Sequence, residues 1–130
     1  MAVIRIELIP EFYFGDDAVL LAADHEGMAA LEQALSHAAE GKDARSLLKT
    51  SGTRHEFLIG GAAGKIEVTK GQVIWNLSAQ KASEILDKLA VLKALSGPGH
   101  HYVDIDSPAQ TLILSVNEYL DSAVFAADQE

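Results

Sequence analysis

The stretch Val19-Leu-Leu-Ala-Ala-Asp24 decides the fold, because it joins an apolar strand to a helix over residues 25–40. A short continuous apolar run is typical of a strand buried on both faces, and Asp24 has the side chain of a helix N-cap. Val73-Ile-Trp-Asn-Leu-Ser78 repeats this arrangement ahead of a second helix over residues 79–95. The two stretches predict a β–α pseudo-repeat, although any α+β domain contains such pairs and the two halves share little sequence identity.

Both predicted helices carry apolar residues at helical spacing, which indicates that one side of each helix is buried. The apolar positions are Met28, Leu31, Leu35 and Ala38 in the first helix and Ala82, Ile85, Leu86, Leu89 and Leu92 in the second. Gly41 fits the end of the first helix and Ser96-Gly-Pro-Gly99 the end of the second. We therefore expect two amphipathic helices packed on one face of a mostly antiparallel sheet.

The strands of this sheet are expected where apolar residues alternate or form short runs. These segments are residues 2–9, 18–23, 55–59, 65–69, 72–77, 102–105 and 111–116. Lys70-Gly71 separates two of them by the two residues of a tight hairpin. Residues 42–54 are expected to form a loop with one helical turn at 46–49. The sequence thus predicts a single α+β domain over residues 1–130, with a frayed acidic tail from about Asp121.

Length and composition exclude several classes of protein. The chain has 130 residues, of which 48% are hydrophobic and 22% are charged, so it is not a disordered chain. It has no cysteine, which excludes disulfides, thiolate zinc sites and cysteine nucleophiles. The longest apolar run, Ala18–Ala23, is far too short to span a membrane, and no signal peptide is evident. We expect a cytoplasmic protein with no membrane partner.

Charge is distributed unevenly along the chain. The formal net charge of −9 divides into −5 for residues 1–50, +2 for residues 51–100 and −6 for residues 101–130. An acidic chain argues against general nucleic-acid binding, because that requires clustered cations facing phosphate. The excess acid favours a basic protein partner, which it would steer electrostatically. The alternative is that these acids only keep the protein soluble.

The segment Gly60-Gly-Ala-Ala-Gly-Lys65 suggests a phosphate-binding loop, but it lacks the features of one. Ile59 stands where a P-loop has its first glycine, and Ile66 replaces the hydroxyl residue that ligates magnesium. A strand rather than a helix is expected to follow, so no helix dipole faces the loop. We interpret this segment as a mobile connection between strands and expect no cofactor.

The densest polar cluster is Gly99-His-His-Tyr-Val-Asp-Ile-Asp106. On a strand, His100, Tyr102 and Asp104 share one side, so His100 and Asp104 are the candidates for a divalent metal site or a His–Asp base. A metal site needs a further ligand, which only His25, His37 or His55 would supply. The alternative interpretation is a strand whose histidines form structural hydrogen bonds.

The aromatic residues give two further expectations. Trp75 lies among Val73 and Leu77 on an apolar strand, so we interpret it as an anchor of the core. Phe12-Tyr-Phe14 is bounded by Gly15-Asp16-Asp17 and forms either part of the core or an acid-rimmed contact site. A core role is the favoured interpretation.

One segment resembles a known family. The helix that contains Leu86, followed by Gly97-Pro-Gly-His-His-Tyr-Val-Asp-Ile-Asp-Ser-Pro108 and Thr111-Leu-Ile-Leu-Ser-Val-Asn-Glu-Tyr119, is similar to small bacterial immunity proteins of polymorphic-toxin systems. Asp24-His-Glu-Gly27, with Leu31 and Leu35 after it, resembles their first strand and helix. The resemblance implies a small acidic cytoplasmic protein that binds and blocks a cognate toxin, often a basic nuclease.

The sequence therefore favours a non-enzymatic binding protein, most concretely an immunity protein that neutralises a basic toxin. The expected contact residues are Asp16, Asp17, Asp104, Asp106, Glu118, Tyr119 and Asp121. Tyr119 would supply an anchor and the acids would pair with lysine and arginine. Two alternatives remain open. One is a metal-dependent or His–Asp enzyme centred on residues 100–106, and the other is an oligomerisation module in which residues 12–14 pair two chains as a homodimer.

Overall fold

A computed structural model describes residues 3–50, 52–61 and 64–119 of the chain. Its elements are β1 (Ile4–Tyr13), β2 (Asp16–Ala23), α1 (His25–Glu40), β3 (Arg45–Thr50), β4 (Thr53–Ile59), β5 (Gly64–Thr69), β6 (Gln72–Leu77), α2 (Ala79–Ala94), β7 (Gly99–Asp104) and β8 (Thr111–Val116). The α+β class predicted from the sequence is confirmed. Of the helices described, neither has the length and apolar character needed to cross a bilayer.

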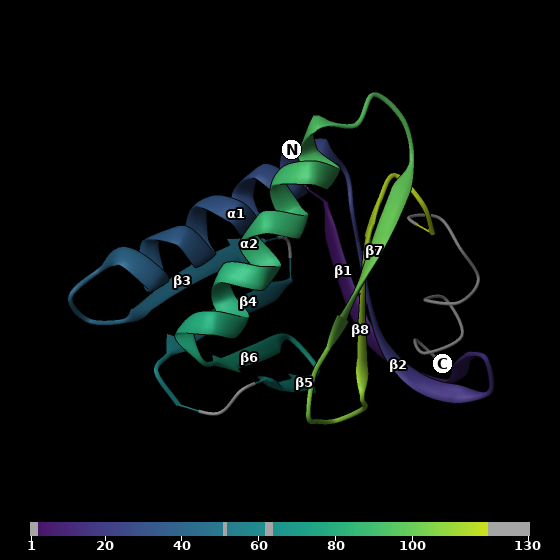
Figure 1. Ribbon diagram of the computed structural model, residues 1–130, viewed down its shortest axis with the longest axis horizontal. Helices are drawn as coiled ribbons and strands as arrows, with labels where there is room; N and C mark the ends of the chain where they lie inside the picture. The colour runs from purple at the N-terminus through teal and green to yellow at the C-terminus, as the bar shows by residue number, and fades with distance from the viewer. Residues whose placement is uncertain (1–2, 51, 62–63, 120–130) are drawn as a thin grey trace.

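The strands form two sheets of four, rather than one larger sheet. Sheet A has the order β1-β2-β8-β7 and sheet B has the order β3-β4-β6-β5. Each sheet consists of two antiparallel hairpins whose inner strands, β2 with β8 and β4 with β6, pair in parallel. Figure 1 shows sheet B on the left, where the two helices lie over it, and sheet A on the right.

The two halves of the chain have the same topology. The first unit is β1-β2-α1-β3-β4 and the second is β5-β6-α2-β7-β8, so each unit is a hairpin, a helix and a second hairpin. Each sheet combines one hairpin from each unit, because the second hairpin of a unit pairs with the first hairpin of the other unit. The fold is therefore a pair of ββαββ units that exchange hairpins about a pseudo-twofold axis.

The register of the strands supports this equivalence in detail. Ala23 pairs with Val116 at the end of one parallel pair, and Leu77 pairs with Ile59 at the end of the other. The next residue in each case closes the pair with the same backbone hydrogen bond, from Asn117 N–H to the carbonyl of Ala23 and from Gly60 N–H to that of Leu77. Both of these residues have a positive φ, 54° for Asn117 and 113° for Gly60.

Helices α1 and α2 are also equivalent, since each has 16 residues and their first residues are 54 positions apart in the chain. Their buried side chains occupy equivalent positions: Met28 with Ala82, Leu31 with Ile85, Leu35 with Leu89, and Ala38 with Leu92. Apart from Val19 with Val73 and Leu35 with Leu89, the residues paired between segments 18–40 and 72–94 differ. The predicted β–α pseudo-repeat is thus present in the structure and extends to the flanking hairpins, while the chemistry of the halves differs.

The main core lies between the helices and the helix-facing sides of both sheets. Helix α1 packs on β3 and β4, α2 packs on β7 and β8, and the two helices pack on each other. Near the middle is a cavity of about 10 Å³ with an apolar lining. Its lining consists of four equivalent pairs: Leu21 with Trp75, Leu31 with Ile85, Leu35 with Leu89, and Phe57 with Leu114. This cavity therefore lies on the pseudo-twofold axis.

The two helices begin at the residues that the sequence predicts. Asp24 Oδ1 accepts a hydrogen bond from Gly27 N–H at 2.6 Å, and Ser78 Oγ accepts one from Lys81 N–H at 3.0 Å. Asp24 has a second task, because its Oδ1 also accepts from Val3 N–H at 3.1 Å. The start of α1 is therefore tied to the start of β1.

Gly27 is the residue that allows this close contact between α1 and β1. A Cβ atom at this position would lie 2.3 Å from the carbonyl oxygen of Val3. We expect Gly27→Ala to lower the free energy of unfolding by about 2 to 3 kcal/mol, because backbone cannot move aside as a side chain can. Lys81→Ala, at the equivalent position of α2, is the control and should cost well under 1 kcal/mol. Urea denaturation of both variants tests this, and equal losses would contradict it.

Residues 42–54 differ from their prediction. The structure places a hairpin here, with β3 and β4 closed between Thr50 and Thr53, instead of a loop with a helical turn at 46–49. Ser46 and Leu48 point toward the helix side, and Ser46 Oγ donates to the carbonyl of Ala34 in α1. The strand forms because β4 and α1 supply partners for it, which a local pattern does not reveal.

Candidate functional site

The faces of the two sheets that point away from the helices have equivalent backbones and opposite chemistry. In sheet A, the cross-strand row is Glu7, Leu20, Ile113 and Tyr102, and the equivalent row of sheet B is Glu67, Ile74, Glu56 and Leu47. Sheet B carries the exposed cations Arg45, Lys49, Arg54 and Lys65 on this face. Sheet A instead carries a second apolar cluster, made of Ile9, Ala18, Leu20, Ala22 and Ile113. The face of sheet A that points away from the helices is therefore the apolar one of the two.

The β1–β2 hairpin reaches over this face because β1 is bulged near its end. Three residues separate Ile9 and Tyr13, whereas a single residue separates their partners Ala18 and Asp16. Glu11 has a φ of 55°, and its N–H donates to Asp17 Oδ1 at 3.1 Å. Asp17, which the sequence predicts as a contact residue, thus also holds the bulge in place.

The bulge brings five aromatic rings together in one groove of about 390 Å³. We call this the aromatic groove, and its lining is Phe12, Tyr13, Phe14, His100, Tyr102, Ile113 and Tyr119. Tyr13 lies 4.9 Å from Tyr102 and 4.8 Å from Phe14 between ring centroids, and Phe12 lies 5.7 Å from Tyr119. Every tyrosine of the chain is in this groove.

The rings of the groove are accessible from outside. Phe14 is 90% exposed, Tyr102 is 41% exposed and Tyr119 is 38% exposed. Phe12 and Tyr13 are half-buried against the second apolar cluster. The expectation that Phe12–Phe14 belong to the core is therefore wrong for Phe14, whose ring the bulged hairpin carries outward. Exposed aromatic residues gathered at one place are typical of binding surfaces.

One end of the groove is polar. His100 Nδ1 lies 3.1 Å from Glu118 Oε1, and Ser115 Oγ donates to the same oxygen at 2.7 Å. His100 also contacts the ring of Tyr102, with 5.3 Å between the centroids. These bonds fix the carboxylate of Glu118 beside the aromatic rings. Because Ser115 bonds to the carboxylate and not to the imidazole, the trio is not arranged as a Ser–His–acid catalytic triad.

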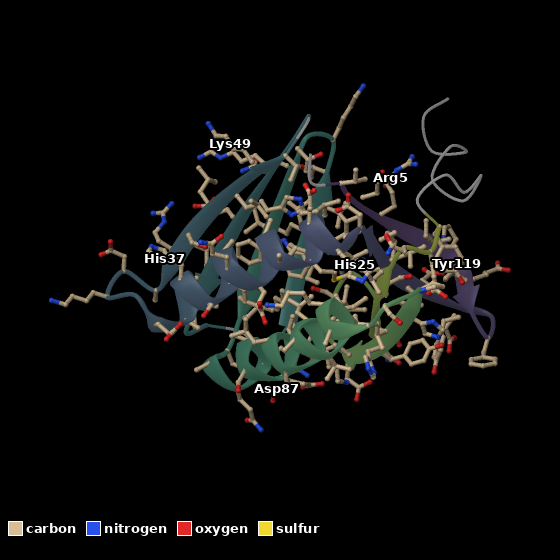
Figure 2. All side chains as sticks on the ribbon, turned by 90° about the horizontal axis from the view of Figure 1, so that it is seen from above. Arg5, His25, His37, Lys49, Asp87 and Tyr119 are labelled. Carbon is tan, nitrogen blue, oxygen red and sulfur yellow. The ribbon has the colours of Figure 1, made fainter. Side chains whose placement is uncertain are left out.

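The predicted contact residues divide between two parts of the same sheet. Asp16, Asp17, Asp104 and Asp106 lie at the end of sheet A where β2 and β8 begin. Glu118 and Tyr119 follow the other end of β8, and Tyr119 reaches Phe12 across the groove. Figure 2 shows Tyr119 at the same end of the molecule as the β1–β2 hairpin. Asp121 lies outside the described residues.

The alternative metal site is not supported by the positions of its residues. His100 and Asp104 share a strand face as predicted, but they are four positions apart on an extended strand, so their Cα atoms are about 13 Å apart. His100 bonds to Glu118 instead. Within the described part of the chain, no three His, Asp or Glu side chains are grouped closely enough for a metal ion.

A larger hollow, of about 610 Å³, lies between the exposed sides of α1 and α2. It is open and carries Glu32, Glu40 and Asp87. Glu32 is paired with Lys93 and Glu40 accepts a hydrogen bond from Ser36. Acidic side chains that are exposed or already paired do not by themselves make a site, so the aromatic groove remains the candidate.

No model of a protein family matches this chain, and neither a curated protein nor a solved structure matches it. We therefore infer the function from the geometry of the groove and from the charges around it.

Proposed function

We propose that this chain is a non-enzymatic binding protein, most concretely an immunity protein that neutralises a basic toxin. Its docking surface is the aromatic groove together with the acidic residues around it, which are Asp16, Asp17, Asp104 and Glu118. The observation that carries the proposal is the convergence of Tyr13, Tyr102 and Tyr119 with two phenylalanines in one open groove. Tyrosine supplies large contact areas at low conformational cost and is enriched among residues that dominate binding energy.

The charges around the groove favour a basic partner. Asp16 and Asp17 flank the hairpin tip, Asp104 ends β7, and Glu118 closes the polar end. No lysine or arginine is among the described residues that line the groove. Such an arrangement accelerates the approach of a basic surface and repels an acidic one.

The proposal is tested with any toxin-like protein whose gene lies next to the gene for this chain. Co-expression should protect the host cell from that toxin, and the purified proteins should form a complex. The double charge reversal Asp16→Lys with Asp104→Lys should lower the association rate about tenfold at low salt, because it removes the attraction between the surfaces. Stopped-flow association measured at several salt concentrations gives this rate.

Asp87→Lys is the control for position, since Asp87 is exposed and lies on α2, away from the groove (Figure 2). It makes one charge reversal of the same sign and should leave the rate within about twofold. A change in the logarithm of the rate for Asp87→Lys that is about half of the change for the double variant would show that net charge alone matters. A toxin that neither binds nor is neutralised would refute the proposed function.

A second candidate function is a homodimer through the hairpin tip. It is favoured by Phe14, whose ring is almost fully exposed at the end of the β1–β2 hairpin. A large exposed apolar side chain at a protruding tip is suited to insertion into a second copy. Light scattering over a range of concentrations tests this idea. A monomer at every concentration, or a dimer that persists in Phe14→Ser, would eliminate it.

A further inference from the structure

The aromatic groove also indicates which part of a basic partner it takes. We propose, resting on the proposed function, that the groove binds the guanidinium group of an arginine side chain presented by that partner. The inference depends on three features of the structure: the ring faces, the held carboxylate of Glu118 and the contrast with the equivalent face of sheet B.

The rings form walls at differing angles around the groove. Tyr13 and Tyr102 are tilted by 47°, while Phe14 stands at 71° to Tyr13 and Phe12 at 75° to Tyr119. Phe14 with Tyr13 and Phe12 with Tyr119 are edge-to-face contacts, each of which covers one face of one ring and leaves the other faces of the pair free of the partner ring. The face of an aromatic ring carries negative electrostatic potential. A cation placed among several faces is attracted to each of them, which is the basis of aromatic cages for cationic ligands.

Glu118 supplies the countercharge at the polar end. Both of its hydrogen bonds, from His100 and from Ser115, fall on Oε1. Among the described residues, no side chain is hydrogen-bonded to Oε2, which keeps its lone pairs for a ligand. The carboxylate is thus oriented before the ligand arrives, and less side-chain entropy is lost on binding.

These two features together favour arginine over lysine. A guanidinium is planar, stacks on aromatic rings and donates hydrogen bonds to a carboxylate from its edge. An ammonium group is more strongly hydrated and offers a point charge without a face to stack. A groove of about 390 Å³ walled by rings and ended by a carboxylate matches the first shape better.

The equivalent face of sheet B acts as an internal reference. Tyr102 corresponds to Leu47 and His100 corresponds to Arg45, while Ile113 corresponds to Glu56. There, Arg45 is itself paired with Glu56 across the strands. A site for arginine on sheet A is therefore a property of its side chains and not of the shared backbone.

The test uses three short peptides of the form Ac-Gly-Gly-X-Gly-Gly-NH₂, in which X is arginine, lysine or citrulline. Citrulline has the shape of arginine without its charge. NMR titration of the full-length protein should show saturable shifts at Tyr13, Tyr102 and Tyr119 with the arginine peptide. Binding of the citrulline peptide should be at least about tenfold weaker, because the cation–π and ionic contributions are lost.

Variants of the protein separate the contributions of the rings and of the carboxylate. Tyr102→Ala and Glu118→Gln should each weaken arginine binding about tenfold. Leu47→Ala is the matched control, because Leu47 is 46% exposed at the equivalent position, and it should leave binding unchanged. Circular dichroism of each variant checks that the fold is intact.

Several results would overturn the inference. These are equal binding of the arginine and citrulline peptides, shifts that map to sheet B, and a dimer that occupies the groove through Phe14. Binding that appears only after deletion of residues 120–130 would make the C-terminal segment the occupant instead. Protection from the toxin without arginine binding refutes this inference and leaves the proposed function standing. Arginine binding without any effect on the toxin refutes the proposed function and leaves the binding of arginine by the groove standing.

Discussion

Lowering the pH from 7 to 4 is expected to remove about 3 kcal/mol from the free energy of unfolding through His55 alone. This residue of β4 has no exposed surface, and burial lowers its pKa from 6.5 to about 4. Above pH 6.5 the imidazole is neutral in both the folded and the unfolded chain. Between pH 6.5 and 4 the unfolded chain binds a proton that the folded chain does not, so stability falls as the pH falls.

The contacts of the ring explain why the protonated form is excluded. Trp75 Nε1–H donates to His55 Nδ1 at 3.2 Å, so Nδ1 must be an acceptor and the ring proton is on Nε2. Protonation of Nδ1 would break this bond and bring two donors together. Nε2 is itself buried without a hydrogen-bond partner among the described residues, so a charged ring would gain nothing there.

The measurement is urea denaturation at half-unit pH steps from 7 to 4. His55→Leu is the control, because Leu112 occupies the equivalent position of the second unit. Between pH 7 and 4, the free energy of unfolding of this variant should fall by at least about 2 kcal/mol less than that of the wild type, whatever its stability at pH 7. A wild-type profile parallel to that of His55→Leu would show that acids elsewhere in the chain account for the loss.

The parts of the fold that the sequence predicts are those that depend on neighbours along the chain. The apolar spacing from Met28 to Ala38 and from Ala82 to Leu92 identifies both helices, and the caps at Asp24 and Ser78 identify their first residues. Trp75 is confirmed as a buried core residue, with 1% of its surface exposed. These features require only helical periodicity and hydrogen-bonding side chains within one turn.

The division into two sheets depends on contacts between distant residues. Strand β2 pairs with β8 about 90 residues away, while β4 pairs with β6 with only β5 between them in the chain. The sequence of β3 lacks the alternation of apolar and polar residues that predicts a strand, because Leu47 and Leu48 are consecutive and point to opposite sides. The Ser51-Gly52 dipeptide was the available signal, since such pairs mark tight turns.

The candidate site was predicted in part. Of the expected contact residues, Tyr119 lines the aromatic groove, Glu118 is bonded to His100 at its polar end, and Asp16 pairs with Tyr13; their role in binding stays a prediction. Tyr102 is not identified from the sequence as a contact residue, and Tyr13 only as part of the alternative contact site at residues 12–14. The two rings meet only through the bulge between Ile9 and Tyr13 and the register of β7 on β8. The extra residues of a bulge change the direction of the side chains that follow it. The local sequence does not show which sheet face these side chains will cover.

The second large expected effect is that of Trp75→Ala, which should lower the free energy of unfolding by about 4 kcal/mol. The indole is stacked on Phe57, with 5.3 Å between the ring centroids, and lines the cavity on the pseudo-twofold axis. Truncation removes its transfer free energy and enlarges that cavity, and both terms are destabilising. It also removes the donor to His55 Nδ1, which leaves this buried nitrogen without the hydrogen bond from Trp75.

Two further variants separate these contributions in urea denaturation followed by circular dichroism. Trp75→Phe keeps most of the ring contact and loses the donor, so it should cost about 2 kcal/mol. Leu21→Ala, at the equivalent position of the first unit, creates a smaller void and should cost about 3 kcal/mol. A loss below about 1.5 kcal/mol for Trp75→Ala would mean that the core closes over the gap. Because Trp75 and Leu21 face the same cavity, their double replacement should cost less than the two single losses added, since one merged void then relaxes as a unit.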